Sequence, residues 1–293
     1  MSVNTLVRKI REKNNPTVAG LDARLEYIPA YITEKYTAQY GKTLKAAAAS
    51  MMEFNKGLID ALHDIVPAIK PQAAYYELLG PDGAVVLRDT IAYAHEKGMY
   101  VIADIKRNDI GATATAYAQA YLGESDVCGE SLPVYNCDSC TVNAYLGTDG
   151  ITPFLNECEA RDRGIYVLVK TSNKSSGEFQ NKLMGDQPLY VRMAEKVAEW
   201  GEGLMTECGY SQVGAVVGAT YPEEQKIIRQ IIPHSYFLVP GYGAQGATAM
   251  RSMMTVWVLS SILPAASCAL GRSAIWTIRK QRARKPSVCA MTS

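Results

Sequence analysis

The chain of 293 residues is 48% hydrophobic and 20% charged, an ordinary composition for a globular protein. Its formal net charge of +1 gives no general reason to expect nucleic acid or a membrane surface as a partner. No apolar run reaches membrane-spanning length and no signal-peptide core is visible near the start, so we expect a cytoplasmic protein with no membrane partner.

Apolar, β-rich runs alternate with amphipathic segments along the chain. The runs predict strands at 17–22, 65–72, 100–106, 139–145, 165–172, 213–220 and 236–241. The segments between them, such as "PLYVRMAEKVAEWGEGLMTEC", repeat apolar residues at three- and four-residue steps, as covering helices do. This alternation indicates an α/β fold with a covered parallel sheet, and the length suits a (β/α)8 TIM barrel. A doubly wound open sheet is the alternative, but no GxGxxG follows the first strand.

The fourth predicted strand follows a CxxC pair, Cys137 and Cys140. Structural zinc would require a second such pair, which the sequence lacks, so we interpret these residues as ordinary thiols and expect no metal site. The odd total of 7 cysteines, without an export signal, fits a reducing compartment. His63, His95 and His234 lie in no recognisable motif.

Polar residues gather at the predicted carboxyl ends of the strands, where barrel enzymes place their catalytic groups. A solvated loop charge or a helix cap would account for any one of them. Two of the residues, Asp104 and Lys106, are two apart on one strand and therefore share a face. Charges about 4 Å apart interact by roughly 4 kcal/mol at an effective dielectric of 20, so a half-buried array is expected only as a mutually compensating, functional network. The set is Asp22, Lys70, Asp104, Lys106, Asp109, Asn143, Thr171 and Ser172.

The stretch "DIKRNDIGATATAY" resembles the Asp-x-Lys-x-x-Asp-Ile signature of the orotidine 5′-phosphate decarboxylases. Other stretches between residues 15 and 246 are similar, in order, to the longer bacterial subgroup of that family: "GLDAR", "IKPQAAYYE", "TVNAYLG", "VLVKTSN", "SSGEFQ" and "VPGYGAQG". The resemblance implies a TIM barrel that converts orotidine 5′-monophosphate to uridine 5′-monophosphate, the last step of de novo pyrimidine synthesis. It also implies that no metal or organic cofactor is needed.

The resemblance gives a role to each matching residue. Loss of carbon dioxide leaves negative charge on C6 of the pyrimidine, and Lys106 would stabilise this charge and deliver the proton. Asp104 would lie beside the substrate carboxylate, and Lys70 would hold the ribose and position Asp104. The remaining contacts would be Asp22 to the ribose hydroxyls, Ser172 to the pyrimidine amide, Gln245 to the phosphate, and Asp109 with Thr113 across a homodimer interface.

The sequence changes character at about Ala247, since no acidic residue follows Glu224 and the tail contains the basic run "RKQRARKPS". It also lacks the "NSSRG"-like turn with which the family binds phosphate. When the last nucleotide of each codon is read with the first two of the next, permitted codons over residues 254–271 spell D-G-L-G-A-I-V-N-S-S-R-G-I-L-C-A-W. We therefore predict a frameshift from about Ala249.

This prediction divides the chain into a barrel domain of residues 1–249 and an out-of-frame tail of residues 250–293. The eighth strand and its phosphate loop are expected to be disrupted, although "TVWVLSSIL" is apolar and could take the eighth strand's place. Activity of this chain would then be impaired. The frameshift also explains the basic tail without nucleic-acid binding.

Three further functions remain as alternatives. A magnesium-dependent lyase acting on keto-sugar phosphates would share the Asp-x-Lys-x-x-Asp signature, although "VLVKTSN" and "VPGYGAQG" favour the decarboxylase. A Schiff-base aldolase could use Lys170, which also ends a predicted strand. An inactive relic of the decarboxylase is the third.

Overall fold

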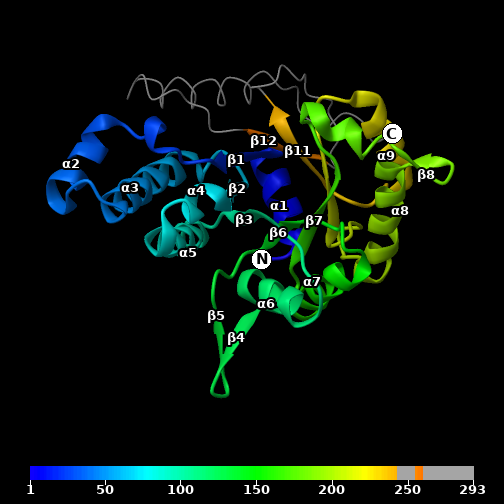
Figure 1. The fold of residues 1–293 in the computed structure, drawn as a ribbon, viewed down its shortest axis with the longest axis horizontal. Helices are drawn as coiled ribbons and strands as arrows, with labels where there is room; N and C mark the ends of the chain where they lie inside the picture. The colour runs from blue at the N-terminus through cyan, green and yellow to red at the C-terminus, as the bar shows by residue number, and fades with distance from the viewer. Residues whose placement is uncertain (243–254, 260–293) are drawn as a thin grey trace.

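The centre of the molecule is a closed barrel of parallel strands in the order β1-β12-β11-β10-β7-β6-β3-β2 (Figure 1). The computed structural model describes residues 1–242 and 255–259 of the chain. The barrel strands are β1 (Thr17–Leu21), β2 (Ala68–Pro71), β3 (Tyr100–Arg107), β6 (Ser139–Val142), β7 (Gly164–Lys170), β10 (Val213–Val217), β11 (Phe237–Tyr242) and β12 (Thr255–Leu259). The predicted (β/α)8 architecture is confirmed.

Helices between successive strands cover the outside of the barrel (Figure 1). The covering helices bury apolar side chains against the outward-facing residues of the strands, as Met51 and Ile59 do in α3, whereas α1 packs against the amino-terminal end of the barrel. The helices are α1 (Val3–Lys13), α2 (Ala30–Tyr40), α3 (Leu44–Leu62), α4 (Ala73–Glu77), α5 (Gly80–Glu96), α6 (Gly111–Tyr121), α7 (Thr148–Arg161), α8 (Leu189–Gly201) and α9 (Pro222–Ile231), with short 3-10 turns at Leu25–Tyr27, Lys174–Glu178 and Glu202–Leu204.

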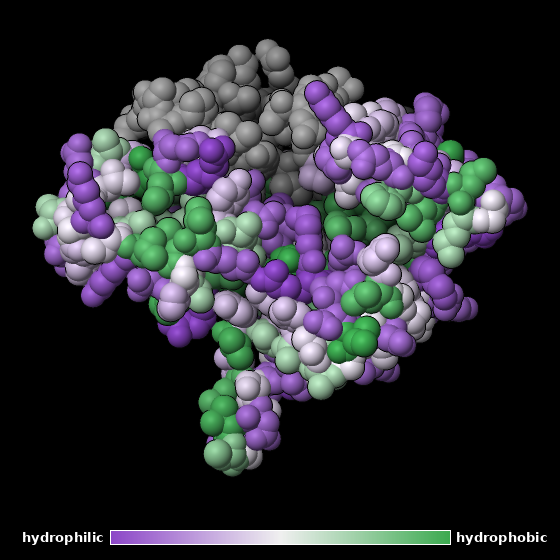
Figure 2. Space-filling model, in the orientation of Figure 1, coloured by the Kyte–Doolittle hydropathy of each residue, from purple (hydrophilic) through white to green (hydrophobic). Residues whose placement is uncertain are grey.

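Two small hairpins lie outside the barrel. One, β4 (Glu124–Val127) with β5 (Glu130–Pro133), stands away from the body of the molecule and exposes the apolar side chains of Val127 and Leu132 (Figures 1 and 2). The other pairs β8 (Leu183–Met184) with β9 (Gln187–Pro188), in the segment that follows β7.

The interior of the barrel has its own apolar cluster, separate from the layer between strands and helices. Alternate strand residues point inward, and α1 adds Val3, Leu6 and Val7, which close the amino-terminal end. The inward-facing members of the cluster are Val18, Ala68, Tyr100, Ile102, Tyr166, Val216, Tyr236 and Leu238. The same alternation continues into polar residues at the carboxyl end, since Lys70 comes two after Ala68 and Asp104 two after Ile102.

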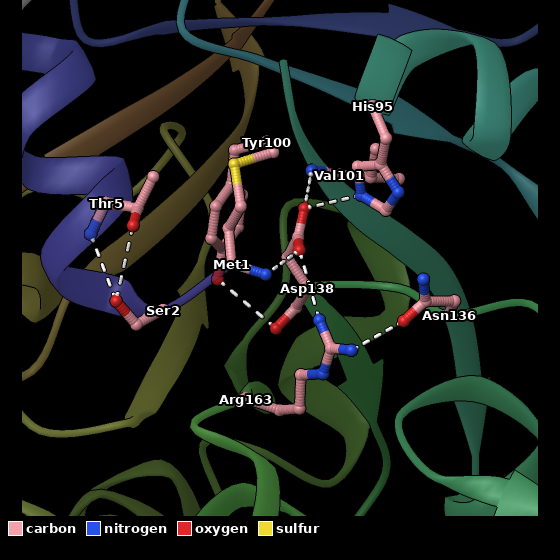
Figure 3. A network of polar contacts seen from close by, with 9 residues as sticks. All are labelled: Met1, Ser2, Thr5, His95, Tyr100, Val101, Asn136, Asp138 and Arg163. Carbon is pink, nitrogen blue, oxygen red and sulfur yellow. Dashed lines mark hydrogen bonds and ion pairs between the residues drawn. The ribbon is translucent and has the colours of Figure 1, made fainter. Parts of the chain in front are cut away.

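A buried aspartate, Asp138, ties the amino-terminal end of the barrel together (Figure 3). Its Oδ1 pairs with the amino group of Met1 and lies 3.2 Å from the guanidinium of Arg163. Its Oδ2 lies 2.9 Å from Nε2 of His95 and accepts the Val101 N–H at 2.7 Å. Asp138 directly precedes β6, so this network lies at the opposite end of the barrel from the polar carboxyl ends of the strands.

The eighth strand differs from the prediction. We expected it to be disrupted, but the backbone of Thr255–Leu259 pairs in parallel with both β11 and β1 and closes the barrel. The run "TVWVL" consists of apolar and β-branched residues, which favour a strand. The register with β11 shifts between Val239 and Tyr242. The expected disruption is therefore wrong for the strand, whereas the phosphate loop falls outside the described residues.

Two smaller predictions can be compared with the structure. Cys137 and Cys140 are buried free thiols, and burial raises the pKa of both. Within residues 1–242 and 255–259, no helix is long and apolar enough to cross a membrane.

Candidate active site

The carboxylate of Asp104, near the carboxyl end of β3, is the centre of a buried polar cluster. Lys106 Nζ donates to its Oδ1 at 2.5 Å and the Thr141 hydroxyl donates to the same oxygen at 2.8 Å. Lys70 Nζ donates to Oδ2 at 2.7 Å and Gln72 Nε2 at 2.9 Å. A carboxylate offers about four lone-pair positions. All four are occupied here, so Asp104 is held firmly in one orientation.

The electrostatics of this cluster keep Asp104 ionised. Burial alone would raise its pKa, but the charges of Lys70 and Lys106 and the hydrogen bonds from both lysines lower it well below the ordinary range. For Lys70, burial opposes the charged form, yet Asp104 and Asp22 raise its pKa. The result is a negative charge and two positive charges fixed at the open end of the barrel.

Lys106 is the member of this cluster that faces outward. Its side chain is 44% exposed, compared with 9% for Asp104 and 6% for Lys70. The residue has a φ of 49°, in the left-handed region that side chains other than glycine rarely adopt. The pairing of β3 with β6 shifts register across this point, between Ala103 and Arg107. This local turn directs the ammonium back over Asp104 instead of along the strand.

The other predicted site residues lie around the same rim. Asp22 follows β1, and its Oδ1 is 3.8 Å from Lys70 Nζ, so it joins the cluster. Ser172 follows β7 and packs closely against Gly218, where an added Cβ would come within 2.8 Å of the Ser172 nitrogen. Asp109 lies beyond β3, where its carboxylate accepts the Ile110 N–H, and Thr113 lies in the first turn of α6. The structure thus brings Asp22, Lys70, Asp104 and Lys106 together. Gln245 lies outside the described residues.

Two residues of the cluster, Gln72 and Thr141, were not predicted as site residues. Gln72 lies two residues beyond Lys70 and pairs with Asp104 through an isolated backbone bridge. Thr141 is buried in β6, within the quoted stretch "TVNAYLG". The sequence did contain a signal for both residues, because alternate residues of a barrel strand point inward. A polar residue at such a position near the end of a strand faces the same space as Lys70 and Asp104.

The cluster does not suit a divalent cation. Magnesium binds through carboxylate and carbonyl oxygens, but the Asp104 lone pairs already accept hydrogen bonds, two of them from ammonium groups. Elsewhere in the described part of the chain, no group of three or more His, Cys, Asp or Glu side chains could hold a metal ion.

A carboxylate and two ammonium groups, fixed beforehand at the carboxyl ends of barrel strands, define a (β/α)8 enzyme that acts on its substrate through preorganised charge. The comparison with known families is consistent with this class. The model of the Orotidine 5′-phosphate decarboxylase / HUMPS family matches residues 46–251, and the chain belongs to this family.

Relatives are similar over most of the chain. An orotidine 5′-phosphate decarboxylase of Caldicellulosiruptor bescii is 43% identical over 241 residues, covering 82% of this chain and 79% of the relative. That of Rhodopirellula baltica is 45% identical over 233 residues, covering 80% and 75%. Among solved structures, the OMP decarboxylase of Leishmania donovani superposes with a TM-score of 0.70 at 30% identity, covering 97% of this chain and 100% of that one.

Proposed function

We propose that this chain catalyses the decarboxylation of orotidine 5′-monophosphate to uridine 5′-monophosphate, the reaction named by its relatives. The observation that carries the proposal is the Asp104 carboxylate, which accepts four hydrogen bonds, one of them from the more exposed ammonium group of Lys106. The reaction leaves a carbanion with no neighbouring electron sink, so a fixed cation that also carries a proton is the group it requires.

The roles follow from the positions of the side chains. The bond between C6 and the carboxylate breaks, carbon dioxide leaves, and the electron pair stays on C6. Lys106 stabilises this negative charge and delivers its proton to C6, where the new C–H bond replaces the carboxylate. Asp104 keeps Lys106 charged and aimed, and its own charge opposes the substrate carboxylate in the ground state. Lys70 and Asp22 form the adjoining pair at 3.8 Å, placed to bind the ribose hydroxyls. Ser172, at the end of β7, contacts the pyrimidine amide.

The phosphate is the part of the substrate most affected by the altered tail. By family resemblance Gln245 binds it, and the arginine of the missing "NSSRG" turn would be its charged partner. Binding energy from a remote phosphate is used at the reacting ring. Loss of one member of a buried charge pair costs about 2–5 kcal/mol, roughly thirty- to several-thousand-fold in catalytic efficiency at 1.36 kcal/mol per factor of ten. This chain is therefore expected to be a slower enzyme than its relatives.

A homodimer completes the proposal, with Asp109 and Thr113 contributed to the partner's site. Apolar side chains are exposed in the segments that follow β2, β3 and β6, which are neighbours in the barrel. Tyr145 is 82% exposed, and Ile110, next to Asp109, is 55% exposed. Leu78 and Leu146 lie in the same segments and are also exposed. Large apolar side chains exposed in neighbouring segments favour a protein interface there, which would put Asp109 at the subunit boundary.

Neither alternative chemistry fits the described site as well. A magnesium-dependent lyase needs oxygen ligands that Asp104 has no free lone pair to supply. A Schiff-base aldolase needs an accessible amine, whereas Lys170 is fully buried, donates to Asn181, and lies 4.6 Å from the ring of Tyr221.

The proposal is tested by following the fall in ultraviolet absorbance of orotidine 5′-monophosphate with the purified chain, with and without a chelator. We expect uridine 5′-monophosphate and carbon dioxide as products, a rate unchanged by the chelator, and loss of turnover in Lys106→Ala. A rate abolished by the chelator and restored by magnesium would support the lyase instead.

A further inference from the structure

Thr141 makes an unusual set of hydrogen bonds beneath the proposed proton donor. Its side chain is buried in β6, on the strand next to β3. The hydroxyl oxygen accepts the backbone N–H groups of both Ile105 and Lys106, each at 3.0 Å. The hydroxyl also lies 2.8 Å from Asp104 Oδ1. One side chain thus contacts three consecutive residues of β3.

The direction of these bonds is fixed by their number. A hydroxyl has one proton to donate and two lone pairs that accept. Both lone pairs of Thr141 are taken by backbone N–H groups, so its proton goes to Asp104. The hydroxyl has no freedom left to rotate, and the carboxylate receives its fourth donor.

The two hydrogen bonds from the backbone of β3 to the Thr141 hydroxyl replace backbone hydrogen bonds that are missing between β3 and β6. The β3–β6 register shifts between Ala103 and Arg107, so the regular strand-to-strand bonds are interrupted where Ile105 and Lys106 lie. A buried N–H without a partner costs about 1–3 kcal/mol. Lys106 also has a φ of 49°, and a residue other than glycine in this region costs of order 1–3 kcal/mol and persists only where its surroundings hold it there.

We propose that Thr141 is a positioning residue for Lys106, holding through its hydroxyl both the left-handed backbone of the proton donor and the carboxylate that aims it. The Thr141 hydroxyl has no hydrogen bond left to offer a substrate, because its proton and both lone pairs are used within the protein. The catalytic part of this inference rests on the proposed decarboxylase function, whereas the structural part does not.

The test compares two substitutions at one position. Thr141→Val keeps the shape and removes the hydroxyl, and Thr141→Ser keeps the hydroxyl. Thr90→Val is the matched control, since Thr90 is an equally buried threonine in α5 whose hydroxyl accepts a hydrogen bond from Asn55 instead of contacting Asp104. Thr141→Ala replaces Thr141→Val if the latter does not fold.

We expect Thr141→Val to lower kcat by about ten- to a hundredfold, the loss that one or two hydrogen bonds would produce, with KM changed less than about threefold. Thr141→Ser and Thr90→Val are expected to stay within about threefold of the parent in both constants. If Thr141 only stabilised the fold, Thr141→Val would lower the fraction of active enzyme, and Thr141→Ser would not restore kcat. Equal kcat in Thr141→Val and Thr141→Ser would overturn the proposal.

A second measurement is independent of turnover. Amide hydrogen exchange at Ile105 and Lys106 is expected to be at least about tenfold faster in Thr141→Val than in Thr141→Ser or Thr90→Val. Unchanged protection in Thr141→Val would refute the positioning role whatever the activity. Faster exchange in Thr141→Val, together with a parent chain that does not decarboxylate orotidine 5′-monophosphate, would support the positioning role and count against the proposed function.

Discussion

Lys106 and Asp104 are two residues apart on β3, and their side chains meet at 2.5 Å where the backbone at Lys106 lies in the left-handed region. Side chains two apart on a strand share a face, so the two charged groups start from the same side of β3. The turn directs the ammonium across the carboxylate and leaves it at the open rim. The left-handed backbone at Lys106 and the four hydrogen bonds accepted by the Asp104 carboxylate are therefore parts of one structure. The charged groups of the site are in position before a ligand binds.

The depressed pKa of Asp104 predicts a specific loss of stability in acid. Because the folded-state pKa lies below the unfolded value of about 3.9, its contribution is present above that value and is lost as pH falls from there through the folded-state pKa. Urea unfolding between pH 5 and pH 3 should show a smaller loss of stability in Asp104→Asn than in the parent chain. Asp89→Asn, at a surface pair with Arg88, is the control. Identical pH dependence in parent and Asp104→Asn would contradict this account.

Gly218 is predicted to control the position of Ser172. A Cβ at residue 218 would come within 2.8 Å of the Ser172 nitrogen and 2.9 Å of its Cβ, so Gly218→Ala must displace Ser172 from the end of β7. We expect KM for orotidine 5′-monophosphate to rise about five- to thirtyfold, the loss of one hydrogen bond to the base. Gly203→Ala, where an added Cβ meets nothing within 4 Å, should leave KM unchanged. Equal KM values in the two variants would show that Ser172 does not contact the base.

Asp138 is predicted to stabilise the barrel without a role in turnover. Removing its charge leaves Arg163 and the Met1 amino group without their carboxylate at the closed end of the barrel (Figure 3). We expect Asp138→Asn to lower the free energy of unfolding by about 3 kcal/mol, with kcat of the folded fraction preserved. Asp126→Asn, on the exposed hairpin, should change stability by less than about 0.5 kcal/mol. A fall in kcat with unchanged stability would reverse this assignment.

The proposed cross-subunit role of Asp109 predicts complementation between two inactive variants. If each site combines Lys106 of one subunit with Asp109 of the other, a mixed dimer of Asp109→Ala and Lys106→Ala chains contains one intact site. Random mixing makes half of the dimers mixed, so about a quarter of the parent activity should return. The absence of any recovery after verified subunit exchange would mean that Asp109 acts within its own subunit. Tyr145→Asp should weaken dimerisation in sedimentation measurements.

Much of the barrel follows from the sequence because alternating strands and helices carry strong periodic signals. The alternation of inward-facing residues would also have predicted two further site residues. Gln72 is two residues after the inward-facing Lys70, and Thr141 occupies an inward-facing position of β6. The left-handed backbone at Lys106 could not be predicted, since nothing in "DIKRND" marks a positive φ in the way that glycine would. The Asp138 network was missed for a related reason: its partners are brought together only by closure of the barrel.

The tail shows a different limit of sequence reasoning. A run such as "TVWVL" has strand propensity whatever frame it was read from, and the structure places Thr255–Leu259 in the eighth position. Strand propensity needs only apolar, β-branched residues, whereas phosphate binding needs particular side chains in a particular turn. The predicted frameshift therefore bears on the phosphate loop more than on barrel closure. Sequencing the coding DNA tests it, because codons unable to spell NSSRG in the shifted frame would rule it out.

The most direct test of the whole account is orotidine 5′-monophosphate decarboxylation by this chain, measured beside a version whose tail is restored to the other frame and beside Lys106→Ala in that restored version. We predict a high rate of decarboxylation in the restored chain and a rate lower by roughly thirtyfold or more in the chain as it stands. The Lys106→Ala variant of the restored chain should show no decarboxylation. A restored chain that does not decarboxylate orotidine 5′-monophosphate, or a Lys106→Ala variant that does so at the parent rate, would contradict the proposed function.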